Sequence, residues 1–382
     1  MLPTLLPDAH YHIDSPGRVN LLGEHVDYND GIVLPVAIDR SVHLQARVVE
    51  PAVVRLKALD LGAEIQFNLT DLESKLDAAG NPLPEWALYP AGIAWAALRA
   101  GLPVTGIEAV YTSTIPIGSG LSSSAAVEVG FGALWQAAGQ WPLNRLELAQ
   151  LCLESERQFV GVNCGLMDQF ASACGVPGQA LYFDTRSLEY HPVPLPPRTA
   201  IVIADSGIRR SLTASAYNDR RAACEQAVHL LKFHLPAIRS LRDVSPLDFD
   251  RFSSSLPDLI EMRARHVVEE IARVEIAGVC LQNGDADGFG RLMLACHASL
   301  RDLYQVSIPE LDELVAIAAA LPGCWGARLT GAGFGGCTVN LVEESHVDDF
   351  IRQLSKDYER QTGKIATVYL CHARQGVTVT SL

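Results

Sequence analysis

The order of hydrophobic and polar residues predicts that the chain begins with β-strands. Residues 32–38 and 41–49 are apolar or alternate between apolar and polar, as strands with one buried face do. Shorter stretches of the same kind follow over 53–58 and 64–69. In residues 84–100 the large apolar side chains instead recur at helical spacing, so we predict the first long helix there.

A strand, a glycine-rich loop and a helix are predicted next. β-Branched residues in partial alternation over 107–115 indicate the strand, and residues 116–128 read PIGSGLSSSAAVE. Small and apolar residues then continue at helical spacing as far as residue 138. A further helix is predicted over 144–159, because Asn144 is a good cap and a glutamate stands three residues beyond it.

The second half of the chain alternates between strand and helix patterns. Residues 179–183 and 188–193 resemble a hairpin, and four prolines among residues 192–197 make the best candidate for a linker. We therefore predict two α+β domains of similar size, residues 1–195 and 196–382. The elements predicted beyond the linker are strands over 199–204, 327–330, 337–342 and 366–371, and helices over 212–234, 263–282, 288–303, 310–320 and from about 347.

Composition and charge narrow the classes of function. The 382 residues are 48% hydrophobic and carry a formal net charge of −14 without a basic run, which argues against nucleic-acid or acidic-membrane partners. No apolar run reaches the ~18 residues that span a membrane, and the first residues lack the pattern of a signal peptide. Nine scattered cysteines without a C-x-x-C pair favour reduced thiols, so we expect a cytoplasmic protein without a zinc site.

The stretch 116–128 combines the features of an anion-binding site. Gly118 and Gly120 let the backbone bend close to a ligand, and the serines at 122–124 can cap free N–H groups of the following helix. The positive end of the helix dipole then faces the loop. The stretch lacks the lysine of a Walker A loop, so a bound phosphate needs Mg²⁺ and arginine for neutralisation. The alternative is an ordinary serine-capped helix after a glycine turn.

Residues 16–28, PGRVNLLGEHVDY, hold more functional groups than a surface turn needs. They match none of the helical metal motifs, whereas carboxylates and imidazole pair well with the hydroxyl groups of a polar substrate such as a sugar. A solvated loop is the alternative. The candidate substrate-binding residues of this segment are Arg18, Asn20, Glu24, His25, Asp27 and Tyr28.

Two acids further along the chain form the next candidate pair. Glu156 lies on the helix predicted over 144–159, and Asp168 follows twelve residues later in a glycine-broken connection. Two acids that flank such a turn suit one metal ligand and one general base. Taken singly, each is better explained as a surface acid.

Residues 329–337, LTGAGFGGC, contain the pattern G-x-G-x-x-G. A dinucleotide-binding loop needs a helix after this pattern, but the residues that follow here alternate as a strand does. We therefore predict a tight hairpin whose backbone comes close to another loop or to a ligand.

Together these stretches resemble the GHMP family of small-molecule kinases. PGRVNLLGEHVDYNDG resembles the signature of the branch that phosphorylates galactose, PIGSGLSSSAAVEV the ATP-binding motif, and LTGAGFGGCTVNLV the third family motif. The stretches GLMDQFAS, YNDRRAACEQA and HASLRDLYQVSIPELDEL match too, so the resemblance spans nearly the whole chain. It implies a two-domain α+β fold with a mixed β-sheet in the N-terminal domain, and an active site in the cleft between the domains.

The resemblance also implies a role for each matching residue. Asp168 would be the general base that takes the proton from the anomeric hydroxyl of galactose, and Arg18 beside it would stabilise the phosphoryl group in transfer from ATP. Ser124 and Glu156 would hold Mg²⁺. The sugar would contact Glu24, His25, Asp27, Gly165 and Tyr217, the ATP would contact Gly118, Ser119, Gly120, Leu121, Ser122, Ser123, Ser124 and Trp86, and Gly333 and Gly335 would abut the site.

Two positions depart from the family pattern and leave alternatives open. Val26 stands where threonine is usual, which removes a hydroxyl from the sugar-binding segment, and Asp14 and Ser15 stand where small apolar residues are usual. A kinase for N-acetylgalactosamine, arabinose or galacturonate is one alternative, although the intact GEHxDYN stretch favours galactose. A non-catalytic galactose sensor is another, but sensors are shorter at the serine loop, which is complete here. We expect a monomer that binds galactose and ATP.

Overall fold

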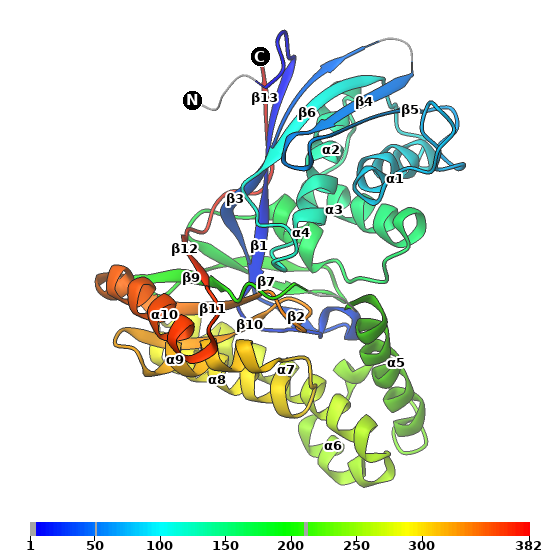
Figure 1. The fold of residues 1–382 in the computed structure, drawn as a ribbon. Helices are drawn as coiled ribbons and strands as arrows, with labels where there is room; N and C mark the ends of the chain where they lie inside the picture. Colours follow the sequence, from blue (N-terminus) through cyan, green and yellow to red (C-terminus); the bar gives the residue numbers. More distant parts are fainter. Residues whose placement is uncertain (1–4, 50–51, 210–212) are drawn as a thin grey trace.

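A six-stranded sheet forms the upper part of the molecule in Figure 1. The computed structural model describes residues 5–49, 52–209 and 213–382. Neighbouring strands of the sheet are antiparallel except β4 and β6, which run parallel, so the sheet is mixed as predicted. In order across the sheet, the strands are β13 (Thr378–Ser381), β1 (Tyr11–Asn20), β3 (Pro35–Val48), β6 (Ile107–Ser113), β4 (Val53–Ala58) and β5 (Ala63–Asn68).

Four helices cover one face of this sheet (Figure 1). Helix α2 (Ser123–Gly139) packs on β1 and β3, and α4 (Met167–Cys174) packs on both strands beside it. Helices α1 (Glu85–Arg99) and α3 (Arg145–Glu154) pack against α2 from outside. The large apolar side chains of α2 are fully buried between these layers, so the helix that follows the glycine-rich loop is fixed in place.

Two smaller sheets and six more helices complete the described fold. Strands β2 (Ile32–Val33), β7 (Gln179–Asp184) and β8 (Tyr190–Pro194) form one sheet, and β10 (Cys324–Thr330), β11 (Cys337–Glu343), β9 (Thr199–Asp205) and β12 (Thr367–Cys371) form the other. Helices α8 (Ala286–Asp302), α9 (Pro309–Ala320) and α10 (Val347–Thr362) pack on the four-stranded sheet, and α7 (Asp258–Gln282) packs on α8 and contacts α5 (Thr213–Leu231) and α6 (Pro246–Phe252). Among the residues that the structure describes, none of the helices has the length and hydrophobicity of a transmembrane segment.

Most predicted elements are confirmed, with ends that shift by a few residues. The helix predicted over 84–100 is α1, and the hairpin predicted over 179–193 is the antiparallel pair β7–β8. The cap at Asn144 is confirmed as a complete capping box: its side chain accepts from the Glu147 N–H, and its own N–H donates to the Glu147 carboxylate. A strand, β11, follows the glycine-rich residues 331–336, as predicted.

Several predictions at this level were wrong. Residues 16–20, interpreted as part of a loop, are the buried end of β1, where the strand pairs with β3 and helices α2 and α4 pack on β1. The two strands predicted over 32–38 and 41–49 are instead the short β2 and the long, unbroken β3. The helix predicted to residue 159 becomes a π-helical turn at Ser155–Val160. Residue 212, the predicted start of α5, lies outside the described residues.

The C-terminal strand returns to the first sheet. β13 pairs with β1, and the N–H of Leu382 donates to the carbonyl of His10. Residues from the C-terminal end therefore complete a sheet that is otherwise built from the N-terminal half. The division of the chain at residue 195 stays a prediction.

Candidate active site

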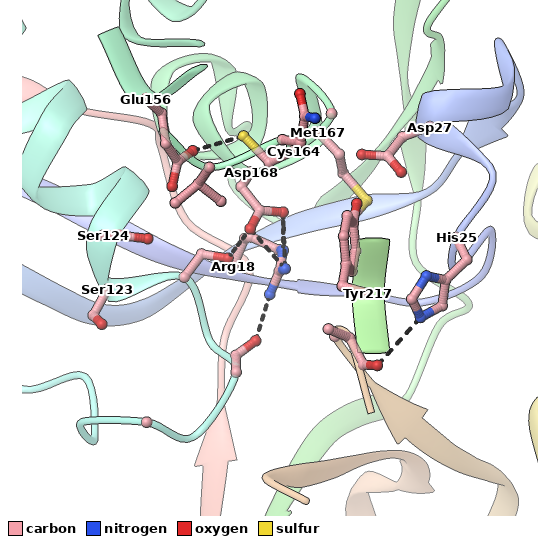
Figure 2. A pocket seen from close by; sticks show the side chains of 18 of the residues that line it. Arg18, His25, Asp27, Ser123, Ser124, Glu156, Cys164, Met167, Asp168 and Tyr217 are labelled. Carbon is pink, nitrogen blue, oxygen red and sulfur yellow. Dashed lines mark hydrogen bonds and ion pairs between the residues drawn. The ribbon is translucent and has the colours of Figure 1, made fainter. Parts of the chain in front are cut away.

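A cavity of about 550 Å³ lies where four loops and several helices meet (Figure 2). The loops are the acidic loop (residues 21–31), the serine loop (116–124), residues 161–165 and the glycine hairpin (331–336), and α1, α4 and α5 are among the helices that contribute lining residues. Most residues predicted for the site are brought together here. Those that line the cavity are Arg18, Glu24, His25, Asp27, Gly118, Gly120, Ser122, Ser123, Ser124, Glu156, Gly165, Asp168 and Tyr217.

Three of the residues predicted to contact ATP are not among the described residues that line the cavity. Ser119 is buried and donates its hydroxyl to a backbone carbonyl of its own loop, and Leu121 is buried in the core. Trp86 packs its ring against β6, while Glu85 and Tyr89 from the same helix line the cavity. The adenine contact of Trp86 stays a prediction.

Arg18 and Asp168 form a bidentate ion pair inside the cavity. Arg18 Nε donates to Asp168 Oδ1 and Arg18 Nη2 to Oδ2, each over 2.9 Å. The third guanidinium nitrogen, Nη1, donates to the carbonyl of Gly120 over 2.7 Å, so Arg18 also binds the serine loop. Arg18 ends up here because β1 carries it, with a β-bulge just before it. Asp168 lies in the first turn of α4, not in an irregular connection as predicted.

The ion pair lies between two groups of side chains in Figure 2. On one side are Ser123, Ser124 and Glu156, and on the other are His25 and Tyr217. A ligand that contacts both groups therefore passes Arg18 and Asp168.

The serine loop does not form the predicted cap. Ser122 precedes α2 with left-handed backbone angles, φ 59° and ψ 50°, and makes no side-chain cap hydrogen bond. Its hydroxyl donates to Asp168 Oδ2 over 2.5 Å instead. Gly118 and Gly120 do have the positive φ angles that the prediction required of them, 70° and 83°. The loop therefore orients the acid and leaves the first N–H groups of α2 free for a ligand.

Glu156 belongs to a group of buried acids. Cys164 Sγ donates to Glu156 Oε2 over 2.8 Å, and the Gln169 side chain donates both to this oxygen and to Glu128 Oε2. Burial raises the pKa of Glu156, and burial together with the charge of Glu156 raises the pKa of Glu128 well above its usual value. This side of the cavity is therefore short of positive charge.

Glu156 and Ser124 fit a magnesium ion. Both known donors to Glu156 bind Oε2, so Oε1 remains for a cation, and carboxylate and hydroxyl oxygens are ligands that Mg²⁺ accepts. In the described part of the chain, no group of three or more His, Cys, Asp or Glu side chains forms a metal site. Two protein oxygens are enough for Mg²⁺ where substrate phosphates and water complete its coordination.

Glu24 is buried in the acidic loop with its charge compensated. Its Oε1 accepts from Arg328 Nη2 over 2.9 Å and from the N–H of Gly331 over 2.8 Å. Burial raises the pKa of Glu24, but Arg328 and Arg18 outweigh this effect and hold the pKa below its usual value. The carboxylate therefore stays charged, with Oε2 outside these bonds.

The pKa of Asp27 is shifted in the opposite direction to that of Glu24. Burial and the neighbouring charges of Asp168 and Glu24 raise the pKa of Asp27 to about 7. Its Oδ2 lies so close to Gly165 that a Cβ atom there would come within 1.8 Å, which explains why glycine stands at 165. Tyr217, from α5, packs its ring 5.5 Å from that of His25.

Three residues of the stretch 16–28 do not line the cavity. Asn20 Oδ1 accepts from the N–H of Leu34, and Tyr28 binds Tyr304, so both act inside the protein. Val26 is fully buried and packs on Gly31. A threonine hydroxyl at this position would therefore lie in the core, outside the cavity lining.

Arg209 lines the cavity, and the sequence analysis did not identify it. It follows β9, forms a bidentate pair with Asp205 over 2.8 and 2.9 Å, and passes close enough to Gly118 that a Cβ there would lie 3.1 Å from Arg209 Cδ. The sequence required an arginine at the lysine-free serine loop, but no local pattern distinguishes this one. Arg209 is identified only by the tertiary structure, which brings this residue beyond the end of β9 close to Gly118.

Comparison with known protein families identifies the class of protein to which this chain belongs. Models described as GHMP kinases N terminal domain and GHMP kinases C terminal match residues 89–176 and 279–360, and the galactokinase galactose-binding signature matches residues 7–48. The matched segments carry Arg18, the acidic loop, the serine loop and Asp168. Fold and cavity together define a GHMP kinase.

Individual relatives show which family of GHMP kinases this chain belongs to. The galactokinases of Roseiflexus sp. (strain RS-1) and Homo sapiens are 46% and 41% identical over 96% and 97% of this chain, and 92% of each relative is covered. The crystal structure of Lactococcus lactis galactokinase complexed with galactose is 36% identical, with a TM-score of 0.91 over 97% of this chain and 95% of that one. Methanococcus jannaschii mevalonate kinase, 20% identical with a TM-score of 0.67 over 97% and 100% of the two chains, shares the fold. The chain belongs to the galactokinase family.

Proposed function

We propose that this protein transfers the γ-phosphoryl group of ATP to the C1 hydroxyl of galactose, which gives galactose 1-phosphate and ADP. The Arg18–Asp168 pair carries this proposal, because it places a proton acceptor and a positive charge between the serine loop and the acidic loop. Phosphoryl transfer to an alcohol depends on this kind of alignment and charge compensation more than on covalent catalysis.

Asp168 is the proposed general base. As the C1 oxygen attacks the γ-phosphorus and the bond to ADP breaks, the hydroxyl proton passes to Asp168. Its Oδ1 accepts a hydrogen bond from Arg18 Nε and keeps a lone pair for this proton. The arginine fork fixes the orientation of the carboxylate and adds positive charge beside the phosphoryl group. In a loose transition state the proton leaves late, so orientation matters more than basicity.

The serine loop is the proposed phosphate site. The free N–H groups and the dipole at the start of α2 attract phosphate oxygens. Arg209, beside Gly118, supplies the positive charge that the lysine-free loop lacks. Ser124 and Glu156 would hold Mg²⁺, which neutralises phosphate charge when it is bound.

The acidic loop is the proposed sugar site. Glu24, Asp27 and Tyr217 line one end of the cavity and offer oxygens that can bind sugar hydroxyls, together with the backbone at Gly165. The nine cysteines are free thiols, which supports a reducing compartment, the cytoplasm.

A panel of sugars tests this proposal. ADP release would be measured with galactose, glucose, N-acetylgalactosamine, arabinose and galacturonate, and kcat/KM should be highest for galactose. Asp168→Asn should lower kcat by about 10²- to 10⁴-fold, the usual contribution of a general base, while ATP still binds. Asp184→Asn is a matched control, since Asp184 pairs with Arg242 outside this cavity, and should keep its activity. Turnover retained by Asp168→Asn would disprove the base, and preference for another sugar would disprove the substrate.

A further inference from the structure

Two buried histidines lie beside the backbone of Glu24. His25 is the next residue of the acidic loop, and His266 comes from α7. Both side chains are buried. Each of the two nitrogens in each ring lies within hydrogen-bond distance of its own partner. The chemistry of these partners fixes where the ring protons are.

His266 holds the acidic loop through a backbone carbonyl. Its Nε2 lies 3.2 Å from the carbonyl oxygen of Glu24, which can only accept, so Nε2 carries the hydrogen. Its Nδ1 lies 2.8 Å from Ser299 Oγ on α8. Burial lowers the pKa of His266 to about 4, so the ring is neutral and Nδ1 accepts the serine proton.

His25 continues the same arrangement on the other side. Its Nε2 lies 3.3 Å from the carbonyl oxygen of Ala332 in the glycine hairpin and must donate, as the dashed line in Figure 2 marks. Burial lowers the pKa of His25 to about 3, so its Nδ1 accepts from the Tyr28 hydroxyl, 2.9 Å away. The Tyr28 oxygen, 2.7 Å from that of Tyr304, then accepts from Tyr304. Both nitrogens of His25 are thus used within the protein.

Direct bonds on either side of the histidines complete the attachment. The N–H of Gly23 donates to Glu270 on α7 over 2.8 Å, and the N–H of Gly331 donates to Glu24 Oε1 over the same distance. The acidic loop is therefore held by α7 on one side and by the glycine hairpin on the other. Rotation of the Glu24 peptide would break the His266 bond and displace the carboxylate.

We propose that His25 and His266 are positioning residues that clamp the acidic loop as neutral Nε2–H tautomers and thereby preset the Glu24 carboxylate for the sugar. His25 was predicted to hold a sugar hydroxyl; here it acts through the loop. This inference rests on the proposed function, in which Glu24 binds galactose. A preset carboxylate spares the sugar the cost of ordering the loop.

Nitrogen NMR tests the clamp without any assay of activity. The full chain would be labelled with ¹⁵N-histidine, and the His25 and His266 signals would be assigned by their loss in His25→Gln and His266→Gln. Both rings should show the neutral Nε2–H pattern at pH 7.5, with and without galactose. A charged ring or an Nδ1–H tautomer at either position, or a change of the His25 tautomer when galactose is added, would overturn the proposal.

Enzyme kinetics tests whether the clamp affects the KM for galactose. Ser299→Ala and Tyr28→Phe each remove the hydroxyl that donates to one histidine, so the KM for galactose should rise about threefold to tenfold. The kcat and the KM for ATP should stay within about twofold, since neither residue lines the cavity. Tyr358→Phe, which removes a fully buried hydroxyl of α10, is the matched control and should leave all three values unchanged.

The two experiments separate this inference from the proposed function. If the wild-type chain released no ADP with galactose, the proposed function would fail, and the ring tautomers would still decide whether the clamp exists. Suppose instead that the wild-type chain phosphorylates galactose, but that Ser299→Ala and Tyr28→Phe have the same KM for galactose as the control Tyr358→Phe. The proposed clamp would then be wrong, and the proposed function would stand.

Discussion

At the level of single residues, Asp27 shows how a binding site can cost stability. Burial, Asp168 and Glu24 raise its pKa to about 7, whereas an aspartate in an unfolded chain has a pKa near 3.9. Between these values the unfolded chain gives up the proton and the folded chain keeps it. The contribution of Asp27 to stability is therefore full below about pH 4 and is lost as the pH rises to about 7.

Asp27→Asn should remove this dependence. The variant should be more stable than the wild type at pH 7.5, by on the order of 2 °C in Tm, and the difference should shrink as the pH falls towards 4. Thermal unfolding at a series of pH values measures the effect, and Asp71→Asn, at an exposed position, is the control for an Asp→Asn substitution as such. A difference that is the same at pH 5 and pH 7.5 would contradict the raised pKa.

Glu156 should show its role through magnesium. Glu156→Gln keeps the size of the side chain but replaces a charged oxygen, so the Mg²⁺ concentration for half-maximal activity should rise at least about tenfold. Glu154→Gln, two residues earlier and not among the residues that line the cavity, should leave this concentration unchanged. An Mg²⁺ requirement that Glu156→Gln does not alter would remove Glu156 from the proposed ligands.

At the level of elements, the junction of the serine loop and α2 uses one serine for two purposes. Ser122 turns the chain with a left-handed backbone and gives its hydroxyl to Asp168. A left-handed conformation costs a non-glycine residue roughly 1 kcal/mol, so a residue selected only for stability would be glycine. The hydroxyl bond to Asp168 is the physical reason for a serine.

Two substitutions of Ser122 separate these purposes. Ser122→Gly should be about 1 kcal/mol more stable than Ser122→Ala, because only alanine keeps the strained backbone. Both variants lose the hydrogen bond to a charged acid, so kcat should fall by about tenfold in each. Urea unfolding and ADP release measure the two effects. Full kcat in Ser122→Ala would show that the hydroxyl is dispensable, and equal stability of the two variants would show that the backbone is unstrained.

At the level of the whole molecule, the two halves of the chain are joined through buried groups. Arg328, on β10, is fully buried and donates to the backbone carbonyls of Leu21 and Asn20 as well as to Glu24. β13 meanwhile pairs with β1 in the first sheet. Because these contacts cross from one half to the other, we expect the described fold to unfold as one unit.

Arg328→Met tests this coupling. The variant leaves the charge of Glu24 buried without its main partner, which should lower the free energy of unfolding by about 3 kcal/mol. Scanning calorimetry should show a single transition in both proteins, at a lower temperature in the variant. Arg291→Met removes an exposed ion pair with Asp287 and should change stability by less than about 0.5 kcal/mol. Two separate transitions in the wild type would show that the halves unfold independently.

Local patterns were enough for much of this molecule. Periodicity located α1, α2 and the β7–β8 hairpin, and Asn144 with Glu147 located the start of α3, because these features depend on residues within a few positions of each other. The glycines of the serine loop were interpreted correctly for the same reason, since a positive φ angle is a property of one residue. The residues themselves identified Arg18, Glu156 and Asp168 as candidates, and the resemblance to GHMP kinases added their roles and the expectation that Arg18 lies beside Asp168.

What the sequence by itself determined is therefore the set of elements, the chemistry available to each loop and the need for an arginine near the lysine-free serine loop. Only the tertiary structure decided which groups meet. Arg18 reaches Asp168 across 150 positions, a contact that no local pattern predicts and that only the family resemblance implied. Arg209 comes to lie beside Gly118, and the Ser122 hydroxyl binds Asp168 although the local pattern predicts that it caps the helix. These contacts depend on how sheets and helices pack, and packing energy is summed over residues far apart in the chain, so no short stretch encodes it.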